Sequence, residues 1–294
     1  MPIRVAVLFG CLAVLSPSVR AQTSDAAVPI SPDRPDLTNS AHLVNPGIVQ
    51  IEAGVIQTRQ DAEHHAFGSP IVARIGVRDW LEAQVGSDGL LIATGAGERA
   101  TGIGNVRLGA KVRLLADSTN QGRFTILPQV SVPAASGARQ LGSGDPDYTL
   151  TFMTGADFGL RVHVDTNYTI GAIGSGGGRA HFAQHVLSGS MSVAVTGQAS
   201  AYFEGFGISR QEAGGRALTA IDTGVIYTIG TRMAVDGGIE AGVSGEAPEF
   251  AAFGGVSVAL GHARATEAAA HAHARPAGPT SASAGQGRGS GPPR

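Results

Sequence analysis

Cysteine, charged residues and aromatic residues are scarce in this chain of 294 residues. Its single cysteine, Cys11, lies near the N-terminus, so the rest of the chain has no thiol for a disulfide, a metal site or a nucleophile. Charged residues make up 15% of the chain, against about 25% in typical domains, and the formal net charge is −2. This charge balance argues against a nucleic-acid partner.

Sequence motifs for catalysis and for cofactor binding are missing as well. The chain contains no Walker loop, no Gly-x-Ser-x-Gly elbow and no His-Glu-x-x-His motif, so we expect neither enzymatic activity nor a cofactor. His271 and His273 have no acidic or thiol partner at ligand spacing, and His64 and His65 fall in an expected surface loop. We therefore expect no metal site either.

Residues 1–21 have the pattern of a cleaved secretory signal peptide. Arg4 precedes an apolar run from Val5 to Leu15, and the small-residue pattern ending at Ala21 follows. The apolar run is about half the length that a membrane-spanning helix needs. The sequence therefore predicts export, and no later apolar run approaches the length of a membrane-spanning helix.

Residues 102–115 contain two classes of side chain that alternate with period two. One face carries Val106, Leu108, Ala110, Val112 and Leu114, and the other carries Asn105, Arg107, Gly109, Lys111 and Arg113. A helix would spread the three cations around its circumference, whereas a strand places them on a single side. The pattern predicts a strand with one apolar and one polar face.

The same alternation continues from Pro46 to Leu260 and predicts twelve strands. We expect them at residues 48–58, 70–77, 80–87, 103–115, 123–132, 147–156, 160–171, 185–195, 198–208, 217–229, 232–242 and 250–260. Short connections alternate with longer ones such as 59–69 and 88–102, as at the two rims of an outer-membrane barrel. Most segments have the roughly ten residues that a tilted strand needs to cross hydrocarbon. We predict an all-β, antiparallel transmembrane barrel over residues 46–260.

Two irregular segments flank the predicted barrel. The leader, residues 22–45, is rich in Ser, Pro, Asp and Asn, and two prolines within residues 31–41 exclude a central strand there. It is either clamped inside the lumen by Asp33, Arg34 and Asp36 or a turn-rich periplasmic leader. Residues 261–294 are rich in Ala, Gly, Pro and Ser, so we expect a disordered tail.

Five motifs in order resemble those of one family. They are 33–38 (Asp-Arg-Pro-Asp-Leu-Thr), 46–54 (Pro-Gly-Ile-Val-Gln-Ile-Glu-Ala-Gly), 74–83 (Arg-Ile-Gly-Val-Arg-Asp-Trp-Leu-Glu-Ala), 102–111 (Gly-Ile-Gly-Asn-Val-Arg-Leu-Gly-Ala-Lys) and 142–147 (Gly-Ser-Gly-Asp-Pro-Asp). The chain resembles the outer-membrane transporter family named for the meta-pathway of phenol degradation. The resemblance implies a barrel in the outer membrane of a Gram-negative bacterium, surrounded by lipid and inserted by the barrel-assembly machinery. Its implied cargo is a small, often aromatic or hydrophobic, solute.

Ionisable side chains are expected on the inward face of this barrel. By alternation these are Glu52, Arg74, Glu82, Arg107, Lys111, Arg113, Arg161, His163, Asp165, Glu204, Asp222, Asp236 and Glu240. Pairing of Glu52 with Arg74, and of Glu82 with Arg107 or Lys111, would simply neutralise the lumen. Alternatively, the cations of the fourth strand and the acids of the ninth to eleventh would create a field that orients a charged or dipolar solute.

A channel or transporter is the function that these patterns favour. One alternative is a membrane-embedded hydrolase, for which His163 with Ser188, Ser190 or Ser192 would supply a Ser-His pair, although the spacing shows no triad. Another is a soluble exported β-sandwich with a binding surface, because such folds also place short strands at regular spacing.

Overall fold

The computed structural model describes residues 30–35, 37–116, 122–134, 141–142, 144–175 and 180–263. The expected signal peptide, the first part of the leader, Asp36 and most of the expected tail lie outside the described residues. Within the described ranges, no helix is both long enough and apolar enough to cross a membrane.

Fifteen strands form one antiparallel sheet. They are β1 (Ile48–Arg59), β2 (His65–Gly68), β3 (Ile71–Arg78), β4 (Leu81–Ser87), β5 (Leu90–Gly95), β6 (Glu98–Ile103), β7 (Val106–Ala116), β8 (Gly122–Val132), β9 (Asp147–Phe158), β10 (Val162–Gly174), β11 (His181–Ala194), β12 (Ala199–Ile208), β13 (Leu218–Ile229), β14 (Met233–Gly245) and β15 (Phe250–Gly261).

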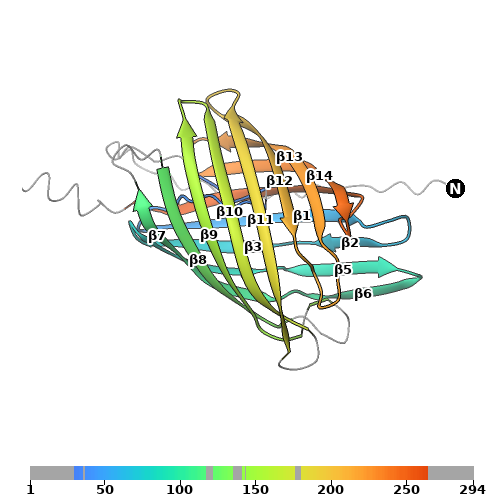
Figure 1. Ribbon diagram of the computed structural model, residues 1–294. Coiled ribbons are helices and arrows are strands. Elements are labelled where there is room, and N and C mark those ends of the chain that lie inside the picture. The colour runs from blue at the N-terminus through green and yellow to red at the C-terminus, as the bar shows by residue number, and fades with distance from the viewer. Residues whose placement is uncertain are drawn as a thin grey trace, which may run out of the picture.

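The sheet closes on itself into a barrel (Figure 1). β1 pairs with β15 from Ile48 opposite Gly261 to Arg59 opposite Phe250, so neither strand leaves a free edge. Apart from β2, β5 and β6, the strands follow one another around the wall in chain order, which gives a barrel of twelve strands. The predicted fold class is confirmed.

Two segments expected as loops, 59–69 and 88–102, instead contain β2, β5 and β6. β2 pairs with the end of β1 and with β5, and β5 pairs with β6, so the three strands extend the wall beyond one rim. In Figure 1 β5 and β6 project past their neighbours at the right. Pro70, which has no N–H, and Gly89, with a φ of 66°, stand where these strands break from β3 and β4.

The two faces of the wall differ as the alternation predicts. Along β7, Leu108 and Leu114 are exposed on the outer face, whereas Lys111 is fully buried inside. The largest fully buried side chains of the described chain include Arg74, Lys111, Glu52, Glu82 and Glu204. The interior is therefore polar and charged and the exterior apolar, as expected for a barrel in lipid.

Residues 30–35 and 37–45, which we call the lumenal segment, run through the interior of the barrel without regular secondary structure. The Ile30 amide donates to the Thr231 carbonyl at the turn between β13 and β14, 3.1 Å away. At the other end, Gly47 donates to the Gly76 carbonyl on β3 at 2.9 Å. Both ends thus lie at the rim that carries the short turns, and the segment enters and leaves the lumen on that side.

Candidate functional site

Wall carboxylates hold the backbone of the lumenal segment. The Leu37 and Thr38 amides each donate to Glu204 of β12 at 2.7 Å, and the Thr38 hydroxyl also donates to it. The Asp33 and Arg34 amides donate to Glu52 of β1, at 3.1 to 3.2 Å. Both carboxylates are almost fully buried. These charge-assisted hydrogen bonds satisfy backbone donors that would otherwise be buried without a partner.

Two further wall acids hold the segment in the same way. We call the wall residues that bind the lumenal segment the clamp. The Val44 amide donates to Glu82 of β4 at 2.7 Å, and the Ala41 amide donates to Asp165 of β10 at 3.2 Å. Thr125 of β8 donates its hydroxyl to the Ala41 carbonyl at 2.9 Å. The segment is therefore held from strands on several sides of the barrel.

Two wall cations bind backbone carbonyls of the lumenal segment. Lys111 of β7 donates to the Ser40 carbonyl at 2.8 Å. Arg74 of β3 donates to the carbonyls of Ser31 and His42 at 3.1 and 3.2 Å. Wall carboxylates accept hydrogen bonds from backbone amides, and wall cations donate to backbone carbonyls. Much of the clamp therefore contacts the backbone of the segment and not its side chains.

Arg74 is also the centre of a buried ion-pair cluster. Its guanidinium lies 3.0 Å from Glu52, 2.8 Å from Glu82 and 3.2 Å from Asp33. Lys111 lies 2.6 Å from Asp33. The pairing of Glu52 with Arg74 matches the sequence hypothesis, whereas Lys111 pairs with the lumenal segment and not with Glu82. Removal of any one charge would leave a buried opposite charge without full compensation.

Arg34 contacts a different part of the wall from Asp33. Its guanidinium contacts Asp236 of β14 at 3.3 Å and the Gly254 carbonyl of β15 at 3.2 Å. A Cβ atom at Gly54 would overlap this guanidinium, so the missing side chain leaves the slot in which Arg34 lies. Asp33 therefore faces the cationic β7, and Arg34 faces the acidic β14.

The lumenal segment separates two cavities. A cavity of about 510 Å³ lies on one side, and its lining includes Leu37, Asp88 and Arg107. A cavity of about 260 Å³ lies on the other side, and its lining includes His42 and Asp157. Of the described residues that line the two cavities, Arg34 alone is common to both.

The other residues predicted for the lumen lie at different depths. Arg107 lines the larger cavity and pairs with Asp88 at 2.6 Å. Asp222 is buried on β13, whereas Arg113 and Glu240 are partly buried. Arg161 lies in the exposed turn before β10 and not in a strand. Asp36, predicted to help clamp the leader, lies outside the described residues.

Several residues in and around the lumenal segment were absent from the sequence prediction. Thr125 and Arg123 share the inward phase of β8, and Asp157 shares that of β9, so the alternation alone contained a signal for them. Arg123 pairs with Asp157 at 3.1 Å. No such signal exists for His42, because the side chains of the irregular lumenal segment do not alternate between two faces.

The Ser-His pair considered for a hydrolase is not assembled around His163. Its Nδ1 lies 2.6 Å from Asp157 and its Nε2 lies 2.8 Å from Asp165. With both ring nitrogens against carboxylates, neither is placed to accept a proton from a serine hydroxyl.

Solved structures with a related fold are outer-membrane barrels. The COG4313 outer membrane channel from Pseudomonas putida F1 aligns with a TM-score of 0.59 and 11% identity, over 81% of this chain and 100% of that chain. The KdgM porin in complex with disordered oligogalacturonate aligns with a TM-score of 0.47 and 8% identity, over 72% of this chain and 98% of that chain. At such identities the first likeness shows the fold alone.

Sequence comparison identifies the family. No curated protein matches this chain. The profile of the family described as MetA-pathway of phenol degradation matches residues 32–260, which contain the lumenal segment almost entirely and all but the last residue of the barrel. The resemblance carried by the five motifs is confirmed, and the chain belongs to this family of the phenol-degradation MetA-pathway.

Proposed function

We propose that this protein is an outer-membrane channel for small amphipathic solutes and that the lumenal segment closes it. The observation that carries the proposal is the division of the lumen into two cavities by a segment that the wall holds through its backbone. A solute that enters the larger cavity must displace part of this segment to reach the smaller one.

The Arg34 guanidinium is held less tightly than the backbone at Thr38 and Val44. Its contacts with Asp236 and Gly254 are 3.2 to 3.3 Å long, whereas the Val44 and Thr38 amides lie 2.7 Å from their carboxylates. Its buried Nε has no hydrogen-bond partner among the described residues. Shorter charge-assisted bonds are the stronger ones, so the guanidinium shifts before the backbone at these two residues does.

The larger cavity suits a solute with one apolar and one polar part. Its lining contains neutral polar side chains such as Gln129, Thr149 and Asn167 beside apolar ones such as Leu127 and Ile173. The aromatic ring of a phenol can contact the apolar side chains, and its hydroxyl can form hydrogen bonds with the polar ones. The description of the family, which concerns phenol degradation, supports the same class of solute.

Ion conductance across planar bilayers tests the closure by Arg34. We expect low conductance for the wild type and a severalfold higher conductance for Arg34→Ala, because the two cavities then join. Arg59→Ala is the matched control. Arg59 is the last residue of β1 and forms an exposed ion pair with Glu249 at 3.2 Å. Equal conductance of wild type and Arg34→Ala would refute the closure.

The solute class is tested on the conducting Arg34→Ala channel. Added phenol should reduce the ion current in a concentration-dependent way, because it occupies the larger cavity. Glucose and benzoate at the same concentrations serve as the polar and the anionic comparison. An equal reduction by all three, or none by phenol, would contradict the solute class and leave the closure unaffected.

A further inference from the structure

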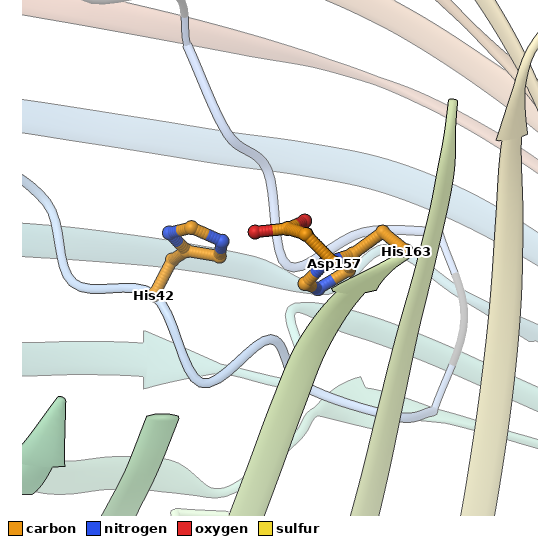
Figure 2. A group of neighbouring side chains, drawn as sticks. All are labelled: His42, Asp157 and His163. Carbon is orange, nitrogen blue, oxygen red and sulfur yellow. The ribbon is translucent and has the colours of Figure 1, made fainter. Parts of the chain in front are cut away.

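Three potential metal ligands meet where the lumenal segment passes the wall. His42 comes from the lumenal segment, Asp157 from the end of β9 and His163 from the start of β10. Their ligand atoms all lie within 4.8 Å of one another. Figure 2 shows the three side chains directed toward one another, from a coil on one side and from two wall strands on the other.

The surroundings of His163 resemble the outer contacts of a histidine ligand. Its Nε2 lies 2.8 Å from Asp165 Oδ2, and metal-binding histidines usually donate their second ring N–H to such a carboxylate. Its Nδ1 lies 2.6 Å from Asp157 Oδ1 and is therefore directed toward the other two ligands. Arg123 holds Asp157 Oδ2 at 3.1 Å, which leaves Oδ1 on the imidazole side.

His42 presents its imidazole ring to this group from the lumenal segment. Its ring centroid lies 5.4 Å from that of His163, at an interplanar angle of 47°. An imidazole binds a metal ion through the lone pair of a ring nitrogen that carries no proton, so His42 would coordinate in its neutral form.

The smaller cavity gives a bound ion access to water. His42, Asp157, His163 and Asp165 all line this cavity of about 260 Å³. A site with three protein ligands beside such a space keeps a fourth position for a water molecule. The cavity lies toward the rim of short turns, where the lumenal segment enters.

We propose that His42, Asp157 and His163 bind a divalent transition-metal ion of the Zn²⁺ class, which cross-links the lumenal segment to β9 and β10. Two imidazoles and one carboxylate suit Zn²⁺, Co²⁺ or Ni²⁺, whereas Ca²⁺ and Mg²⁺ require oxygen ligands. The ion takes the place of the proton between His163 Nδ1 and Asp157 Oδ1, and that proton leaves to water. Among the described contacts of the lumenal segment, this one alone would depend on a bound metal ion.

Metal titration of the untagged, refolded chain in detergent tests the site. We expect about one Zn²⁺ ion per chain, lost in His42→Ala and in His163→Ala, and bound about 10–100-fold more weakly in Asp165→Asn. His64→Ala is the matched control, because His64 also contacts a carboxylate, that of Asp61 at 2.9 Å, but on an exposed loop. Equal binding by wild type and His42→Ala would place the ion on other histidines and overturn the proposal. Absence of binding to the wild type would overturn it as well.

A second variant keeps the test independent of folding losses. His42→Cys retains a side chain that can coordinate metal, and the mature chain has no other thiol if cleavage follows Ala21. With Co²⁺ we expect a sulfur-to-metal charge-transfer band in this variant and none in the wild type. Hydrogen exchange of residues 38–45 should also slow when Zn²⁺ is added and not when Ca²⁺ is added. A folded variant without the band, or exchange that ignores Zn²⁺, would refute the cross-link.

Discussion

Lys111 Nζ lies 2.6 Å from Asp33 Oδ2 in the middle of the lumen, and both side chains are more than nine-tenths buried. One partner belongs to the wall strand β7 and the other to the lumenal segment, so this pair ties the segment to the barrel. Because both charges are buried, removal of one partner should destabilise the fold more than the loss of a surface salt bridge would.

Replacement of Lys111 by Met should lower the free energy of unfolding by about 3–5 kcal/mol, because Asp33 then keeps a buried charge without its nearest cation. Urea unfolding of the refolded barrel measures this change. Arg107→Met should cost less than about 1 kcal/mol, since its pair with Asp88 is about one third exposed. If the two losses were alike, the burial of the Lys111 pair would have no energetic consequence.

Charge placed on the outer face should be far more damaging than charge placed inside. Leu108→Arg puts a cation into lipid and should lower the unfolding free energy by about 2–4 kcal/mol if the site lies near the bilayer midplane. Gln129→Arg is the inward control, because Gln129 lines the larger cavity on the adjacent β8. Folding into liposomes compares them, and equal sensitivity would contradict the assignment of the two faces.

A methyl group at Gly76 should displace the end of the lumenal segment. A Cβ there would overlap the Asn45 carbonyl, whereas the nearest atom to a Cβ at Gly189 would be 3.8 Å away. We expect Gly76→Ala to cost about 1–3 kcal/mol and Gly189→Ala clearly less. Limited proteolysis near residue 45 should also be faster in Gly76→Ala alone. Unchanged proteolysis in that variant would show that the segment tolerates the shift.

Ion preference should depend on Arg107 more than on the other cations of β7. Arg107 lines the larger cavity, whereas Lys111 is fully bound by the lumenal segment. In the conducting Arg34→Ala background, Arg107→Glu should move the reversal potential toward cation preference, and added salt should reduce the shift. Arg59→Glu, at an exposed pair, should leave the potential unchanged. No shift in Arg107→Glu would place its side chain outside the ion path.

The barrel itself could be read from the sequence with few errors. Period-two alternation assigns Leu108 outward and Lys111 inward without knowledge of any partner strand, because successive side chains of a strand point to opposite faces. The misassigned segments, 59–69 and 88–102, are those in which short strands interrupted at Pro70 and Gly89 add to the wall. Short strands give too few alternations to be distinguished from loops.

The sequence alone thus determined the fold class, the two faces of the wall and the inward position of charges such as Glu52 and Arg74. Only the tertiary structure showed that Glu204 and Glu82 bind backbone amides of residues 37–44, and that His42 meets Asp157 and His163. The physical reason is that an irregular segment has no repeating pattern that fixes its neighbours. Its path is set by which buried donors and acceptors of the closed barrel it satisfies, and these come from strands distant in sequence.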